Sequence, residues 1–148
     1  MQSEYRAFWN DKMWEVTQIS YSSPQTVGLK SGELEHSCVP REEIILMKNT
    51  WKKDISGEYV YEGDFIESHQ GTKILDILML VKYGTYNAYC PADDAYMDNV
   101  GFFVVAAGYP QMPLGPLSEY AKVIGNMCQN HDWLERKGEK QASIQNIP

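Results

Sequence analysis

Residues 46–67 read LMKNTWKKDISGEYVYEGDFIE, and this stretch predicts a β-hairpin around which the chain is organised. An apolar run leads into a charged turn at residues 52–57, and residues 59–66 return as a second extended segment. Inside that segment Gly63 can adopt the positive φ that a bulge or turn requires, and the Asp64 carboxylate can accept backbone hydrogen bonds. The aromatic residues beside them suit a pleated, half-buried surface.

The remaining chain also favours β structure, because its apolar segments are short, alternate or are rich in Ile and Val. We expect strands at residues 4–9, 13–21, 42–48, 72–83, 85–90, 102–107 and 118–127, the first two forming a hairpin. Gly71 and Gly84 bound the most apolar stretch and favour a strand over a buried helix there. Residues 22–35 are predicted to be a loop, and the Pro-rich residues 109–116 a connector.

Two of these segments, residues 72–83 and 102–107, are apolar on both faces. Antiparallel strands usually leave one face to water, so something must cover the second face. A second layer of the same chain would do so, and so would another subunit. Homo-oligomerisation is therefore expected alongside self-coverage, since symmetric self-association is the commonest kind of assembly.

These patterns predict a mainly β, antiparallel fold, either a small barrel or a sandwich, with one short C-terminal helix. Asp132 and Glu135 have the spacing of a capping box at its start, and Gly138 would end it. We expect a single domain over residues 1–138 and a flexible tail at residues 139–148.

Charge and cysteine content restrict the function. The net charge is −7 over 148 residues, which makes nucleic acid an unlikely partner because phosphate binding depends on clustered Lys and Arg. The three cysteines, Cys38, Cys90 and Cys128, include no CxxC pair, as expected of a reduced intracellular protein. No signal peptide and no segment long enough to span a bilayer are visible in the sequence, so no membrane association is expected.

Three blocks of sequence carry a resemblance to a known family. They are TxxxDxxG with VYEGDFI between Thr50 and Ile66, YRAFW with Lys12 and Met13 near the start, and KVIGN followed by Asn130 and Leu134 near the end. In order and spacing the chain resembles the YopX-like family of bacteriophage and prophage proteins. It departs from that pattern at Trp51, where Gly is usual, at Cys128 and Gln129, and at His131.

This resemblance implies a phage- or prophage-encoded accessory protein in the cytoplasm of a bacterial host. The family is associated with no established catalytic activity, so the resemblance implies a non-enzymatic protein and no cofactor. We expect an oligomeric β-rich module that binds a host or phage macromolecule. Within the central block, the residues expected at a binding site are Tyr61, Glu62, Gly63, Asp64 and Trp51.

The alternative is a small metal-dependent or acid/base hydrolase. Glu62 and Asp64 fall on one face of a strand, and His69 follows within a strand length, so these three residues are the candidate catalytic groups. Against this, Gly63 and Asp64 already have a sufficient role as a turn. The usual signatures of acyl transfer, dinucleotide binding and P-loop chemistry do not occur in the sequence.

No metal site is expected, although two sequence patterns contain residue types that bind metal ions. The acidic cluster of Asp93, Asp94 and Asp98 lacks the spacing of an EF-hand, and a solvated loop explains it. His36 with Cys38, and Cys128 with His131, are each half of a zinc site, and they would have to converge. One basic and aromatic patch remains, formed by Trp51 with Lys48, Lys52 and Lys53, whose lysines are best explained as protecting an edge strand.

Overall fold

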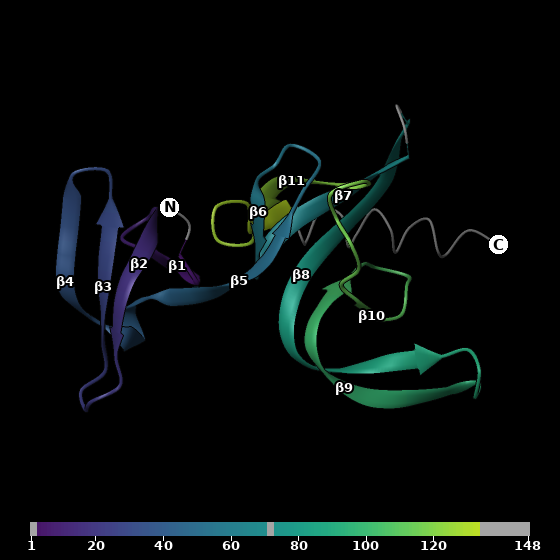
Figure 1. The fold of residues 1–148 in the computed structure, drawn as a ribbon, viewed down its shortest axis with the longest axis horizontal. Helices are drawn as coiled ribbons and strands as arrows, with labels where there is room; N and C mark the ends of the chain where they lie inside the picture. Colours follow the sequence, from purple (N-terminus) through teal and green to yellow (C-terminus); the bar gives the residue numbers. More distant parts are fainter. Residues whose placement is uncertain (1–2, 71–72, 134–148) are drawn as a thin grey trace. The chain divides into compact units, whose positions relative to one another are not determined.

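The computed structural model of the chain describes residues 3–70 and 73–133, of which residues 69–70 and 73–76 are described by their backbone alone. Two antiparallel sheets contain the strands, in the orders β4-β3-β2-β1-β5-β6 and β10-β9-β8-β7-β11. The chain divides into two compact units, residues 1–49 and residues 50–148 (Figure 1). Each sheet is open at both edges, so the prediction of a closed barrel is wrong, while the sandwich stays a prediction.

The first unit is a meander of antiparallel strands. It contains β1 (Tyr5–Trp9), β2 (Lys12–Ser20), β3 (Thr26–Ser31), β4 (Leu34–Pro40), the 3₁₀ turn η1 (Arg41–Glu43) and the first part of β5 (Ile45–Lys53). The predicted first hairpin is confirmed, and its turn places Asn10 and Asp11 at φ 52° and 58°. Two residues with positive φ twist a hairpin in the direction that its strands prefer, and Asn and Asp tolerate this conformation.

The prediction of a loop over residues 22–35 is wrong, because this segment contains β3 and the start of β4. Val27 and Leu29 are almost fully buried in the core of the first unit, together with Trp14 and Val39. The Ser, Pro and Gly residues around them are typical of a loop, and the strand has only two large apolar side chains. Packing of these two side chains against β2 offsets the conformational entropy that the segment loses when it becomes a strand.

The second unit contains the rest of β5 with β6 (Tyr59–Tyr61), β7 (Asp64–Gln70), β8 (Lys73–Cys90), β9 (Ala95–Val105), β10 (Met112–Pro113) and β11 (Ala121–Asn126). The central hairpin is present, but its second segment divides at Gly63, which has φ 89°. As a result β6 continues one sheet and β7 starts the other. Gly63 donates to the carbonyl of Val81 and accepts from the N–H of Met127, so this turn also connects to β8 and to the end of β11.

Residues 72–83 were predicted to be a strand rather than a helix, and β8 confirms this for residues 73–83. Both faces of its proximal part are covered by the chain itself, as one of the two alternatives predicted. On one face Met79 and Val81 pack with Leu114, Leu117 and neighbouring residues, and on the other Leu78 and Leu80 pack with Phe65.

The predicted last strand is shorter than expected, and its bulge is confirmed by a register shift between Val123 and Gly125. A Cβ atom on Gly125 would lie 2.7 Å from the ring of Trp133, so the indole occupies the space that this glycine leaves. Of the predicted helix, only Asp132 and Trp133 are described, both in helical conformation, and residues 134–138 lie outside the described residues. Within the described ranges, no helix is long and apolar enough to cross a membrane.

Candidate functional site

The carboxylate of Asp64 has a structural role in the turn between β6 and β7. It is 1% exposed, and its Oδ2 accepts a hydrogen bond from the backbone N–H of Tyr61 at 2.8 Å. Asp54, which the sequence placed only in a charged turn, has a similar and larger role. Its Oδ1 accepts from the N–H groups of Ser56 and Glu58, and its Oδ2 accepts from Val123 at 3.0 Å. Asp54 therefore connects the β5–β6 turn to β11.

The three candidate catalytic residues occupy different environments. Asp64 is buried, Glu62 is half-buried in the adjacent turn, and the side chain of His69 lies outside the described residues, although its backbone pairs with Ile74. Among the described residues, no group of three His, Cys, Asp or Glu side chains is arranged to hold a metal ion. In one half of the zinc pattern, His36 contacts the rings of Trp9 and Trp14, and Cys38 is exposed.

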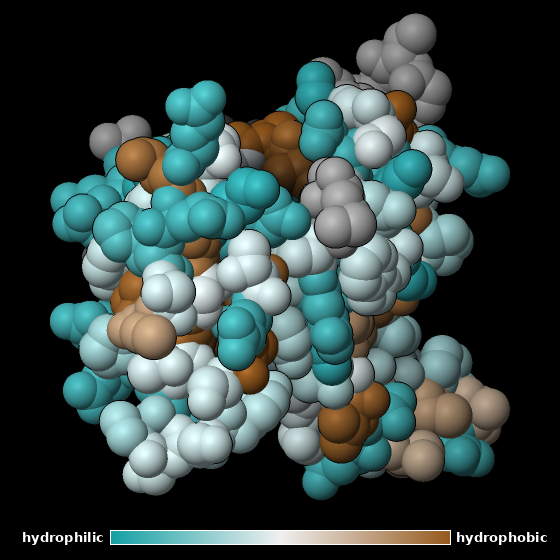
Figure 2. Space-filling model, turned by 60° about the vertical axis from the view of Figure 1, so that its left-hand side comes forward, coloured by the Kyte–Doolittle hydropathy of each residue, from teal (hydrophilic) through white to brown (hydrophobic). Residues whose placement is uncertain are grey.

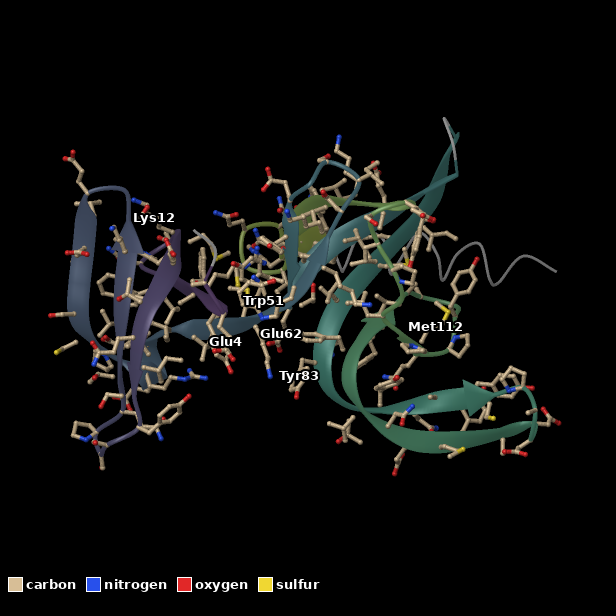
Figure 3. All side chains as sticks on the ribbon, in the orientation of Figure 1. Glu4, Lys12, Trp51, Glu62, Tyr83 and Met112 are labelled. Carbon is tan, nitrogen blue, oxygen red and sulfur yellow. The ribbon has the colours of Figure 1, made fainter. Side chains whose placement is uncertain are left out.

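Trp51 stands out at an irregularity in β5. Its φ is 60°, a left-handed conformation that is rare for a bulky residue, and the neighbouring Thr50 hydroxyl accepts from the N–H of Lys52 while donating to the carbonyl of Val60. The indole is 53% exposed and meets the ring of Tyr59 edge-on at 5.6 Å, with the Lys53 ammonium 5.0 Å from the same ring. Figure 3 marks its place on the ribbon.

The structure thus brings together only some of the residues of the basic and aromatic patch. Trp51, Tyr59 and Lys53 form one exposed cluster, which we call the Trp51 cluster. Lys52 instead donates to the carbonyls of Leu114 and Gly115, at 3.3 and 3.2 Å. Strand β5 pairs with β1 through residues 45–48, before Lys52 and Lys53, so the explanation of these two lysines as guards of an edge strand stays a prediction. Of the other predicted binding residues, Tyr61, Gly63 and Asp64 are buried and Glu62 is half-buried.

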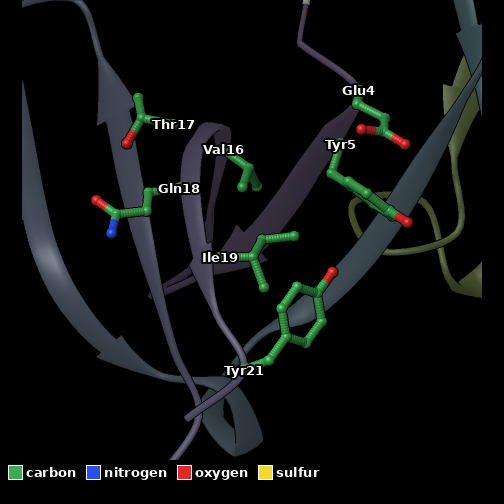
Figure 4. Close-up of a pocket in the computed structure, with 7 residues that line it drawn as sticks. All are labelled: Glu4, Tyr5, Val16, Thr17, Gln18, Ile19 and Tyr21. Carbon is green, nitrogen blue, oxygen red and sulfur yellow. The ribbon is translucent and has the colours of Figure 1, made fainter.

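The described residues of each unit line a hollow on the surface. The hollow of the first unit has a volume of about 370 Å³ and lies between the start of β1 and the end of β2, where Glu4, Tyr5, Ile19 and Tyr21 face it (Figure 4). The hollow of the second unit has a volume of about 310 Å³, and we call it the apolar groove. Its lining includes Met79, Val104, Ala106, Met112, Tyr109, Tyr120 and Ser68. Neither hollow is lined by Glu62 or Asp64.

A long hairpin of β8 and β9 reaches beyond the core of the second unit. The sequence predicted that Gly84 and Gly101 end their strands, and this is wrong, since both strands continue through them. The two glycines face each other in the ladder at φ 143° and 153°. Such angles are accessible mainly to glycine, and the paired strands bend at this point as one ribbon (Figure 1). We call residues 83–102 the arm.

One face of the arm is aromatic and exposed. Cross-strand partners share a face, and the pairs Tyr83 with Phe102, Thr85 with Val100, and Tyr89 with Tyr96 all belong to the same face. The rings touch across the strands, with centroids 4.7 Å apart in the first pair and 5.3 Å apart in the last. Tyr83 stands out from the ribbon in Figure 3, and Val100 is 73% exposed. Figure 2 colours residues by hydropathy, and on the side of the molecule that it shows, hydrophobic residues reach the surface between hydrophilic ones.

The opposite face of the arm is held at its base. Tyr86 is buried and stacks on Phe103 with ring centroids 4.7 Å apart and an angle of 17° between the planes. The N–H of Asn87 donates to Oε1 of Gln111 in the connector. These contacts fix the direction of the arm, while its aromatic face is left to solvent.

No family model matches this chain, and neither a curated protein nor a solved structure does.

The tip of the arm offers a test of its geometry by pH. The hydroxyl of Tyr89 donates to Oδ1 of Asp94 at 2.7 Å, and this hydrogen bond raises the pKa of Tyr89 above the usual value for tyrosine. Only the neutral phenol can donate to the carboxylate, so this hydrogen bond stabilises the protonated form of Tyr89. Asp94→Ala removes the acceptor and is therefore expected to lower the pKa of Tyr89 toward about 10. An NMR pH titration of ¹³C-labelled tyrosine would check this, and an unchanged Tyr89 signal would contradict the geometry of the tip.

Proposed function

We propose that this protein is a non-enzymatic binding module that acts through the aromatic face of the arm. It would serve as an accessory protein of a phage or prophage in the cytoplasm of a bacterial host, as the resemblance to the YopX-like family implies. It would work as an oligomer and bind a host or phage macromolecule, with protein the favoured class of partner.

The observation that carries this proposal is an exposed aromatic surface on a hairpin whose base is held by contacts with the rest of the second unit. Tyr83, Tyr89 and Tyr96 are 43%, 42% and 58% exposed on one face. Aromatic residues dominate the energetics of protein interfaces because they bury a large area with little loss of conformational freedom. The Trp51 cluster is a second exposed aromatic surface in the same unit.

Protein is favoured over nucleic acid because of the charge on the arm. Residues 83–102 contain three carboxylates, Asp93, Asp94 and Asp98, and no Lys, Arg or His. Phosphate groups would be repelled by this surface, since nucleic-acid binding requires cations that replace counterions. The Trp51 cluster has the composition of a stacking site, but it contributes a single lysine.

The environment of the candidate catalytic carboxylates also supports a binding function. Asp64 accepts a backbone hydrogen bond inside its turn, and neither Glu62 nor Asp64 lines either of the two hollows described above.

A shortened arm tests the proposal. Because Asn87 and Asp98 are cross-strand partners, residues 88–97 can be replaced by Asn-Gly, which closes a two-residue hairpin turn. The tagged protein would be recovered from the lysate of an infected host, with nuclease treatment, and its partners compared by mass spectrometry. We expect the wild type and Glu62→Gln to retain the same stoichiometric protein, and the shortened variant to lose it. Equal recovery by the shortened variant, with unchanged circular dichroism, would contradict the proposal.

A further inference from the structure

One carboxylate lies inside the aromatic face of the arm. Asp98 is the cross-strand partner of Asn87, and along β9 it lies between Tyr96 and Val100 at alternate positions of the same face. The pairing of β8 with β9 runs through the arm without a register shift, so this alternation is unbroken. Asp98 is exposed, and its two neighbours on β9 are 58% and 73% exposed. The face therefore presents a negative charge between two large, exposed side chains.

The two carboxylates at the tip of the arm differ from Asp98, because they have partners within the arm. Asp94 accepts from the hydroxyl of Tyr89 at 2.7 Å, and Asp93 accepts from the thiol of Cys90 at 3.7 Å. In the described part of the chain, no side chain donates a hydrogen bond to the carboxylate of Asp98 or forms an ion pair with it. The arm itself contains no Lys, Arg or His that could neutralise this charge.

A protein that covers the aromatic face must also cover Asp98. Successive side chains on one face of a strand are about 7 Å apart, so contact with both Tyr96 and Val100 removes the carboxylate between them from water. Burial of a carboxylate is costly unless it is paired and hydrogen-bonded, and a neutral donor leaves the charge itself uncompensated. Since the arm supplies no cation, the partner has to supply one.

The surroundings of this carboxylate favour arginine as the cation. A guanidinium group can donate two parallel hydrogen bonds to a carboxylate and stack on an aromatic ring, whereas the lysine ammonium is a strongly hydrated point charge. The ring of Tyr96 occupies the next position on the same face, and it contacts the ring of Tyr89 with centroids 5.3 Å apart. A cation that interacts with a ring lies within about 6 Å of its centroid, which a guanidinium paired with Asp98 can satisfy at this spacing.

We infer that the aromatic face of the arm binds an arginine side chain of its partner protein, with the guanidinium paired with Asp98 and packed against the ring of Tyr96. This inference rests on the proposed function, because it names the chemistry that the arm recognises in its partner. The net charge of −7 attracts a basic surface before contact and speeds association at low salt. Added salt therefore weakens the complex.

Two peptides that differ in one charge test the inference. The first is N-acetyl-Ser-Leu-Ser-Arg-Ser-Leu-Ser-amide, whose extended form places its arginine and two leucines on one face at the spacing of Tyr96, Asp98 and Val100. The second contains citrulline in place of arginine, which keeps the shape of the side chain and removes its charge. Each peptide is titrated into the ¹⁵N-labelled full chain, and its dissociation constant is measured from the amide signals of Thr85, Asn87 and Asp98.

We expect the wild type to bind the arginine peptide about tenfold more tightly than the citrulline peptide. Asp98→Asn should abolish this preference, because the amide keeps the shape of the carboxylate without its charge. Asp93→Asn is the matched control, since it removes one carboxylate from the turn between β8 and β9, outside the aromatic face, and it should retain the preference. A third peptide, with lysine in place of arginine, should bind more weakly than the arginine peptide.

Several results would overturn the inference. They are equal binding of the arginine and citrulline peptides, equal binding of the arginine and lysine peptides, a preference that survives in Asp98→Asn, and arm signals that none of the peptides changes. The recovery of protein from the lysate separates this failure from a failure of the proposed function. If the shortened arm loses the recovered protein while Asp98→Asn retains all of it, the arm is the binding surface and the pairing with arginine is wrong. If the shortened arm retains it, the proposed function itself fails.

Discussion

Replacing Asp54 by alanine is expected to lower the free energy of unfolding by about 3 kcal/mol or more. The carboxylate is 3% exposed and accepts three backbone hydrogen bonds, two within the β5–β6 turn and one from Val123 in β11. Alanine would remove all three hydrogen bonds to this carboxylate, and a hydrogen bond to a charged group contributes roughly 1.5–3 kcal/mol. The turn would lose its hydrogen bond from Val123 and keep the one that the N–H of Ile55 donates to the carbonyl of Ala121 in β11.

Chemical denaturation of Asp54→Ala, followed by tryptophan fluorescence, checks this prediction. Asp54→Asn should lie between the variant and the wild type, because its amide retains one acceptor oxygen. Glu119→Ala, which removes an exposed carboxylate from the same unit, is the matched control and should change little. If Asp54→Ala were as stable as Glu119→Ala, the role assigned to this carboxylate would be wrong.

The second large effect is expected for Phe65→Ala, at about 3–5 kcal/mol. Phe65 is completely buried at the start of β7, where it packs with Leu78 and Leu80 and lies 5.7 Å from the ring of Trp133. These residues form the smaller of the two cores of the β7–β8–β9 sheet. Removal of the ring would leave a cavity that β-strands fixed by their ladders cannot close.

Thermal unfolding of Phe65→Ala measures this loss, with Tyr21→Ala as the control for removing an aromatic ring that is 73% exposed. A melting temperature close to that of the control would show that Phe65 is not part of a cooperative core. Phe65→Leu should recover most of the stability, since it retains most of the buried apolar volume.

Short-range patterns in the sequence predicted much of this fold. The first hairpin, the central turn and the bulge at Gly125 follow from alternation and from glycine or Asn at the turn, and the β conformation of residues 73–83 follows from their Ile and Val content. These features depend on residues that are neighbours in the chain. They are therefore visible before the tertiary structure is known.

The features that were not predicted depend on contacts between residues that are far apart in the sequence. Strand β3 is specified by the burial of Val27 and Leu29 against β2, and no local pattern outweighs its Ser, Pro and Gly neighbours. The arm was missed because a glycine after an apolar run was taken as a strand end. Gly84 faces Gly101 across the ladder, and only this pairing shows that the ribbon bends and continues.

The candidate site was predictable in part. Trp51 was expected at a binding site, which stays a prediction, and its indole is exposed beside Tyr59 and Lys53. The role of Asp54 was missed because its partner Val123 is far away in sequence. The aromatic face of the arm could have been found from the alternation of Tyr83, Tyr89 and Tyr96 around Gly84 and Gly101.

The central claim is that the aromatic face of the arm is where this protein contacts its partner. Hydroxyl-radical footprinting read by mass spectrometry tests it most directly, because it reports the exposure of single side chains. Tyr83, Tyr89 and Tyr96 should lose reactivity in the complex with the protein recovered from the lysate, while Tyr21 in the first unit stays reactive. Unchanged reactivity of the three arm tyrosines in that complex would contradict the account.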